Sequence, residues 1–143
     1  MPRVAPLFAA GFVLALAAGP PAAAQEQEDR LTLDLYVDWE QVRSPQVSPD
    51  GEQIVYTRRW IDKINDRWKS SLWIMNADGS RSRHLTEGSS PQWSPDGQRL
   101  AFLREGEPKG TQIFVRWMDA EGAETQITNL ERSPSNVSWA PDG

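Results

Sequence analysis

Ser44-Pro-Gln-Val-Ser-Pro-Asp-Gly51 is the stretch that decides the fold, because it returns as Ser90-Pro-Gln-Trp-Ser-Pro-Asp-Gly97. A third copy, Val137-Ser-Trp-Ala-Pro-Asp-Gly143, closes the sequence. The Pro-Asp-Gly triplets begin at Pro49, Pro95 and Pro141, which are 46 residues apart. A fixed interval of this length is typical of proteins built from repeated supersecondary units.

Each copy of the motif predicts a tight turn between two antiparallel strands. Proline fixes φ at the first central position, aspartate suits the second, and glycine adopts the positive φ that follows. The runs after the first two turns, Gln53–Thr57 and Arg99–Leu103, have the composition of strands. Both carry apolar residues on both faces, which indicates strands buried between stacked sheets.

A second motif between the turns supplies two more strands. Leu72–Gly79 (LWIMNADG) is followed by Arg83–Thr86, and Ile113–Gly122 (IFVRWMDAEG) is followed by Gln126–Thr128. Four short strands in about 45 residues are typical of one blade of a β-propeller. The predicted fold class is therefore all-β, an incomplete propeller of four-stranded antiparallel blades. Residues 44–143 should hold about two blades and the first strand of a third.

Aromatic residues recur at matching positions of the repeat. Trp93 and Trp139 stand where the first copy has Val47, and Trp73 matches Phe114. Because repeat units bury their faces on their neighbours, we interpret these side chains as packing between blades. An aromatic box that binds a ligand is the alternative.

Two segments lie outside the repeat. Residues 25–43 form a lead-in, in which Thr32 caps a short helix or, alternatively, residues 33–37 form a strand. Trp60–Lys69 is a polar insertion between the second and third strands of the first unit, and Gly106–Gly110 is its shorter counterpart. Loops of this kind gather on one face, where binding residues usually lie.

Residues 1–24 predict a cleaved export signal. Arg3 precedes the uncharged apolar stretch Leu7–Ala18, Gly19-Pro-Pro21 ends any helix, and Ala22-Ala-Ala24 has the small side chains that a signal peptidase needs. A membrane span needs about 20 apolar residues, and this stretch has only 12. We expect cleavage after Ala24, no membrane span in the mature chain, and a periplasmic or secreted protein.

The composition excludes several classes of function. Hydrophobic residues make up 38% and charged residues 24%, as in soluble globular proteins. The net charge of −5 argues against nucleic acid as a partner. The sequence has no cysteine, which excludes disulfides, a thiol nucleophile and a Cys-based zinc site. It also shows no phosphate loop, metal-ligand cluster or calcium loop, so we expect no cofactor and no metal.

At these motifs the sequence resembles two groups of proteins. One is the N-terminal propeller of the prolyl oligopeptidase family of serine peptidases, in its acylaminoacyl peptidase and dipeptidyl aminopeptidase branch. The other is the periplasmic Tol-system propeller. The resemblance rests on the Ser-Pro-Asp-Gly turns, on Leu72–Gly79 and on the closing His84-Leu-Thr86, and it covers about Thr32 to Gly143. The short lead-in leaves no room for the α/β domain that precedes the Tol propeller, which favours the peptidases.

The resemblance implies the propeller portion of an exported serine peptidase, which gates the access of short peptides to a C-terminal α/β-hydrolase domain outside this sequence. In that family the hydrolase domain carries a Ser-His-Asp triad, with its serine in a Gly-x-Ser-x-Gly turn. The nearest match here, Gly88–Gln92, lacks the second glycine. The single histidine, His84, lies in a strand motif without a nucleophile partner. We therefore expect no catalytic residue in this sequence.

One alternative function stays open. A non-catalytic Tol-type periplasmic propeller that binds a protein partner has the same repeat, and a fold alone does not fix a function. Propellers need about four to eight blades to close, so we expect the sequence to be part of a longer protein. Asn136-Val-Ser138 matches a glycosylation sequon, but we expect it to lie inside a strand.

Overall fold

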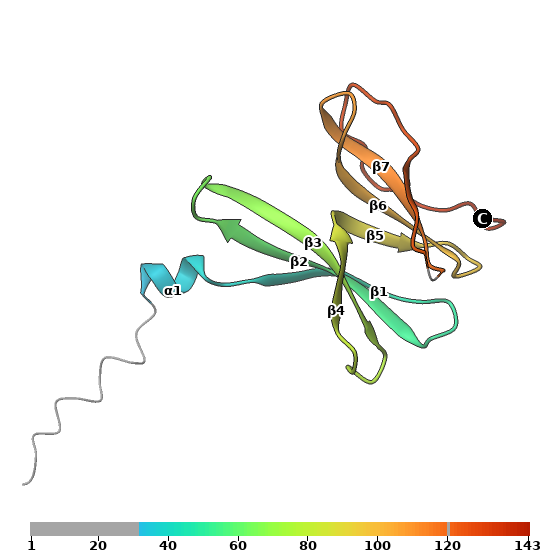
Figure 1. Cartoon of the computed structure of the whole chain (residues 1–143), viewed down its shortest axis with the longest axis horizontal. Helices are drawn as coiled ribbons and strands as arrows, with labels where there is room; N and C mark the ends of the chain where they lie inside the picture. The colour runs from blue at the N-terminus through green and yellow to red at the C-terminus, as the bar shows by residue number, and fades with distance from the viewer. Residues whose placement is uncertain (1–31, 120) are drawn as a thin grey trace, which may run out of the picture. The chain divides into compact units, whose positions relative to one another are not determined.

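The computed structural model describes residues 32–119 and 121–143, and the predicted export signal lies outside them. This part of the chain contains two four-stranded antiparallel sheets (Figure 1). The all-β fold class, with antiparallel sheets of four strands, is therefore confirmed.

Each sheet is a meander in which every strand pairs with the next one along the chain. Sheet one consists of β1 (Gln41–Val47), β2 (Gln53–Asp62), β3 (Arg67–Asn76) and β4 (Arg83–Glu87). Sheet two consists of β5 (Ser89–Trp93), β6 (Arg99–Gly106), β7 (Gly110–Trp117) and β8 (Glu124–Gln126).

The two complete Ser-Pro-Asp-Gly turns join β1 to β2 and β5 to β6 with the same hydrogen bonds. In the second turn, Ser94 N donates to Arg99 O and Gly97 N donates to Ser94 O, both at 2.9 Å. The buried Ser94 hydroxyl accepts from Arg99 N at 2.9 Å and donates to Asp96 Oδ1. Gly97 has a φ of +70°, as the turn chemistry predicts.

A residue other than glycine with a left-handed φ also recurs at the 46-residue interval. The φ angles of Ser44, Ser90 and Asn136 are +48°, +54° and +54°. At the first two, the pairing register shifts as in a β-bulge, which bends the strand. Asn136 is exposed and lies outside any strand, because its segment has no antiparallel partner among the described residues. The expectation that the sequon lies inside a strand is therefore wrong.

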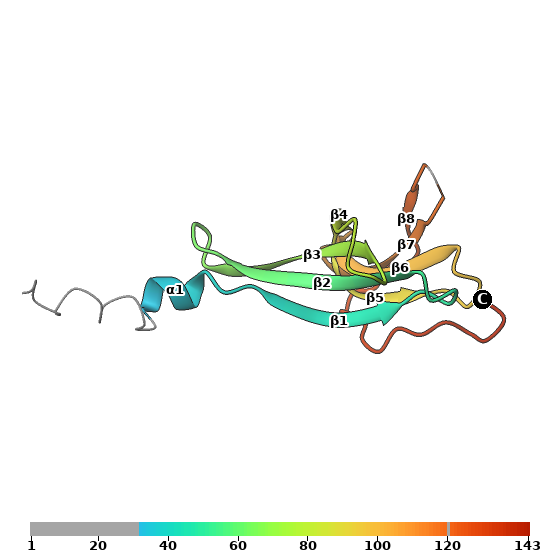
Figure 2. The same ribbon diagram turned by 90° about the horizontal axis from the view of Figure 1, so that it is seen from below.

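The described part of the lead-in, residues 32–43, contains one short helix and the start of strand β1. Helix α1 (Leu33–Val37) begins after Thr32, whose Oγ1 accepts a hydrogen bond from Leu35 N at 3.3 Å. Of the two alternatives, the capped helix is the one that the structure contains. Figure 2 shows α1 beside the end of sheet one at which β2 turns into β3, where Lys63 Nζ lies 2.5 Å from Asp38 Oδ1.

The polar insertion at Trp60–Lys69 is a loop only at its tip. Strands β2 and β3 continue through it, with Trp60 paired to Lys69 and Asp62 to Arg67. The Asp62 carboxylate closes the turn by accepting hydrogen bonds from the backbone amides of Ile64 and Asn65. The prediction that the whole of Trp60–Lys69 is a loop between the strands is therefore wrong, because continued cross-strand pairing satisfies the backbone groups outside the tip.

The core lies between the two sheets. Val55 and Leu72 of sheet one pack with Leu100, Phe102 and Phe114 of sheet two.

Two tryptophans make contacts between successive repeat units. Trp93 packs against this core, and its Nε1 donates to Gln46 O at 3.4 Å. Trp139 Nε1 donates to Gln92 O, one repeat later, at 3.0 Å. The interpretation of these two tryptophans as packing between repeat units is confirmed. Trp73 instead lies on the other face of sheet one, against Arg58 and His84.

Candidate binding groove

The two sheets leave a groove between them, which we call the inter-sheet groove. It consists of two adjoining cavities of about 360 and 390 Å³. Both are lined by Trp68, Lys69 and Ser70 of β3 and by Ser89 of β5. Volumes of this size are typical of sites for small ligands.

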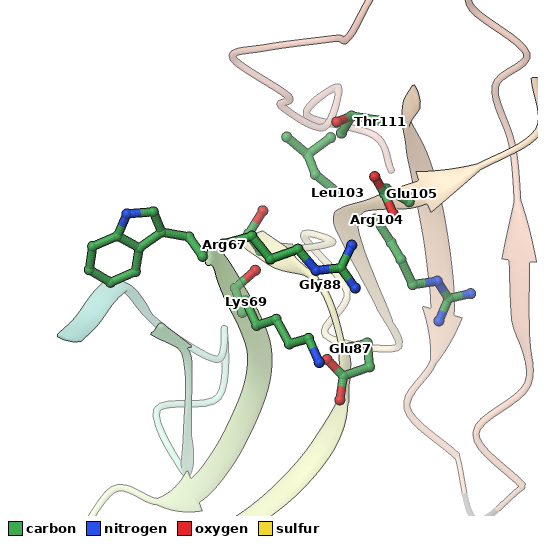
Figure 3. A pocket seen from close by; sticks show the side chains of 11 residues that line it. Arg67, Lys69, Glu87, Gly88, Leu103, Arg104, Glu105 and Thr111 are labelled. Atoms are coloured by element: carbon green, nitrogen blue, oxygen red, sulfur yellow. The ribbon is translucent and has the colours of Figure 1, made fainter. Parts of the chain in front are cut away.

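Gly88 shapes the wall of the groove, where the link between β4 and β5 passes close to β6 (Figure 3). Its φ is +145°, and a Cβ atom there would lie 2.7 Å from Phe102 Cδ2 and 2.8 Å from Leu103 O. Only glycine accepts both this backbone conformation and this close approach.

The first cavity has mixed charge. Arg67, Lys69 and Arg104 line it together with Glu87 and Glu105 (Figure 3). Opposite charges in one cavity offset each other, so this part of the groove has no strong preference for ligands of either sign.

Arg104 already has partners. Its Nη1 lies 2.5 Å from Glu124 Oε2 and 3.3 Å from Thr86 Oγ1, and its guanidinium stands 4.0 Å from the centre of the Phe114 ring. Glu124 also binds Arg116 at 2.6 Å. Burial raises the pKa of Glu124, but the hydrogen bonds from Arg104, Thr86 and Arg116 outweigh it and hold the pKa below its ordinary value. Arg104 therefore joins the sheets and is not free to bind a ligand.

The second cavity is cationic. Arg43, Arg59 and Lys69 line it, and the other lining residues, apart from Trp68, are serines and a threonine. Lys69 is paired with Asp62 at 2.8 Å, and this contact holds the pKa of Asp62 well below its usual range. Arg43 and Arg59 form no ion pair within the part of the chain that the structure describes.

Sequence reasoning missed the groove residues, since it assigned no site residue in this chain. The sheet register brings them together from separate strands. One signal was available: at the repeat interval of 46, Arg43 and Arg59 correspond to Ser89 and Glu105. Positive charges that appear in only one of two matching units are candidates for function.

His84 does not lie in the groove. Its Nε2 is 3.4 Å from Glu87 Oε1, and its ring stands edge-on to Trp73. Within residues 32–119 and 121–143, no cluster of three acidic or histidine side chains could hold a metal ion. No helix in the same part of the chain has the length and apolar character to cross a membrane.

Two curated proteins with related sequences are peptidases. Dipeptidyl-peptidase 5 of Porphyromonas endodontalis is 28% identical over 138 residues, which cover 96% of this chain and 16% of that protein. The uncharacterized peptidase YuxL of Bacillus subtilis is 33% identical over 107 residues, which cover 71% of this chain and 16% of that protein. This chain thus spans about 16% of the length of each relative. No family model matches it.

Solved structures show the same fold at low sequence identity. The acylaminoacyl peptidase of Pyrococcus horikoshii matches 75% of this chain and 16% of its own, with a TM-score of 0.61 and 18% identity. The β-propeller domain of the Trilobed protease from Pyrococcus furiosus matches 74% of this chain and 32% of its own, with a TM-score of 0.61 and 21% identity. This chain is a segment of a β-propeller that resembles the N-terminal propeller of prolyl oligopeptidase-family peptidases, and its homologues are peptidases.

Proposed function

We propose that this segment belongs to an exported serine peptidase and that its propeller limits which substrates reach the catalytic domain. The observation that carries the proposal is the relation to two peptidases over most of this chain but only 16% of theirs. The remaining length of such a protein is ample for a catalytic domain. The propeller would then act by excluding large substrates, while the chemistry lies outside these residues.

The topology supports this arrangement. In a four-strand meander, the first strand begins and the last strand ends at the same end of the sheet. That end of sheet one carries Gln41, where β1 begins beside Arg59, and Glu87, where β4 ends in the wall of the inter-sheet groove. A domain joined to the propeller before its first strand and after its last would therefore lie on the side of the blades that carries Gln41 and Glu87.

Export is supported by the composition of residues 1–24, in which a positive start, an apolar stretch and a small-residue site follow in order. Such a signal would direct the chain out of the cytoplasm and be removed after Ala24.

One preparation tests both the reaction class and export. The complete gene product is purified from the periplasm or the medium, its N-terminus is determined by mass spectrometry, and the protein is treated with a fluorophosphonate that labels reactive serines. We expect an N-terminus at Gln25 and one labelled serine outside residues 32–143, with loss of peptide hydrolysis as labelling proceeds. A protein that retains residues 1–24 would contradict export. A protein that hydrolyses no peptide and takes up no label would contradict the peptidase assignment.

A further inference from the structure

The cationic cavity of the inter-sheet groove has the chemistry of an anion site. Its charged lining residues are Arg43, Arg59 and Lys69, and no carboxylate lines it. Lys69 is neutralised by Asp62 at 2.8 Å. The charge that remains available to a ligand is therefore that of the two arginines.

Sheet register places the two arginines on one face. Arg43 is paired with Thr57 and Gln41 with Arg59, so Arg43 and Arg59 are diagonal neighbours across β1 and β2. Diagonal partners of this kind are within reach of each other when their side chains are long. Both residues line the same cavity, so the strand register brings two arginines to one site.

Contacts with neighbouring residues hold both guanidinium groups while leaving donors free. The Arg59 guanidinium lies over the Trp68 ring, 4.2 Å from its centre, so its N–H groups point outward in its own plane. Arg43 uses Nε to donate to Gln41 Oε1 at 2.9 Å, which leaves its two terminal nitrogens. Among the described residues, neither arginine has a carboxylate partner.

The surroundings suit an extended ligand with one charged end. Ser70, Ser89 and Ser90 add neutral hydroxyls around the arginines, and the cavity of about 390 Å³ continues into its neighbour. A free inorganic anion would use only a small part of this space. A short chain that ends in a carboxylate would fill more of it, because planar guanidinium groups bind carboxylates through paired hydrogen bonds.

We propose that Arg43 and Arg59 bind the C-terminal carboxylate of a short peptide in the inter-sheet groove. The choice of a peptide as ligand rests on the proposed function; the carboxylate chemistry rests on the two arginines. Bound in this way, the peptide is retained at the propeller through its C-terminal end, and its N-terminal end stays free for a catalytic domain.

The test compares trialanine with trialanine amide, which differ only in the C-terminal carboxylate. Binding to the complete protein is measured by calorimetry after fluorophosphonate treatment, so that a serine peptidase does not consume the probe. We expect trialanine to bind about tenfold more tightly than its amide, the difference that a charge-assisted pair provides. In R43Q and R59Q this preference should fall to less than about twofold, whereas affinity for the amide stays unchanged.

R132Q is the matched control, because Arg132 is exposed and does not line the groove. It removes the same charge and should keep the full preference for trialanine. If R132Q lost the preference for trialanine as R43Q and R59Q do, the net charge of the protein and not the site would attract the peptide. That result overturns the proposal. Failure of trialanine to bind, or equal affinity for trialanine and its amide, also overturns it.

A further arm separates the peptide from a free anion. Inorganic phosphate is titrated under the same conditions, and we expect it to compete with trialanine only weakly. Phosphate that binds as tightly as trialanine would overturn the assignment to a peptide. The outcome is also distinct from that of the proposed function: hydrolysis without a carboxylate preference contradicts only this site, and a preference without hydrolysis contradicts only the peptidase assignment.

Discussion

At the scale of single residues, two glycines with positive φ have different reasons to be glycine. Gly51 lies in the first turn with a φ of +77°, and a Cβ atom there would meet nothing within 4 Å. Gly88 has a φ of +145° and is also packed against Phe102 and Leu103. Backbone conformation alone therefore requires glycine at the first position, whereas conformation and space both require it at the second.

Substitution of the two glycines by alanine should separate these effects. G51A should lower the free energy of unfolding by about 1–2 kcal/mol, the cost of a left-handed residue with a side chain. G88A should lower it by about 2–4 kcal/mol, because overpacking adds to backbone strain. Denaturant unfolding of the protein measures both. If the free energy of unfolding fell equally in the two variants, the link between β4 and β5 would be able to move away from β6.

Among the sheet elements, β8 carries Glu124, which holds Arg104 at the contact between the two sheets. Its side chain is 19% exposed and binds Arg104 and Arg116 of sheet two, and Arg104 in turn donates to Thr86 of sheet one. These bonds favour the ionised carboxylate and lower its pKa.

The lowered pKa of Glu124 makes the stability of the protein depend on pH. Because the folded pKa lies below that of the unfolded chain, ionised Glu124 stabilises the fold above roughly pH 4.3, the ordinary value for a glutamate. This contribution disappears as the pH falls through the folded pKa. The free energy of unfolding of E124Q should be about 1–2 kcal/mol lower than that of the wild type near neutral pH. In the acid range it should change less with pH than the wild-type value does.

The comparison variant for Glu124 is E131Q, which alters an exposed glutamate. Unfolding free energies are measured from neutral pH into the acid range for both variants and the wild type. We expect E131Q to follow the wild type. An E124Q curve parallel to the wild-type curve throughout would contradict the role given to this carboxylate.

The same scale shows what the sequence can predict. Turn chemistry and the 46-residue interval specify the positions of β1, β2, β5 and β6, because proline, aspartate and glycine restrict φ locally. The length of the β2–β3 hairpin was not predicted, since its polar residues look like a loop until their pairing partners are known. The groove was not predicted either. Arg43 and Arg59 are 16 positions apart in sequence, and only strand register makes them neighbours.

At the scale of the whole molecule, the two repeats present matching faces. Arg104 of β6 lies over Phe114 on the face of sheet two that packs against sheet one, at 4.0 Å. The equivalent Arg58 lies over Trp73 at 4.7 Å, on the face of sheet one that points away from sheet two. One repeat thus carries the same contact surface as the next, and this repetition is what allows blades to stack around a propeller.

The dependence of hydrolysis on substrate length tests whether the propeller limits access to the catalytic domain. The complete protein is assayed with a tripeptide, with a longer peptide of several dozen residues that begins with the same three residues, and with a folded protein that carries them at its N-terminus. Recognition at the cleaved bond is then constant, and only the size of the substrate beyond these three residues changes. A propeller that limits access predicts that kcat/KM falls steeply from the tripeptide to the folded protein. Equal kcat/KM for all three substrates would show that the propeller does not limit access.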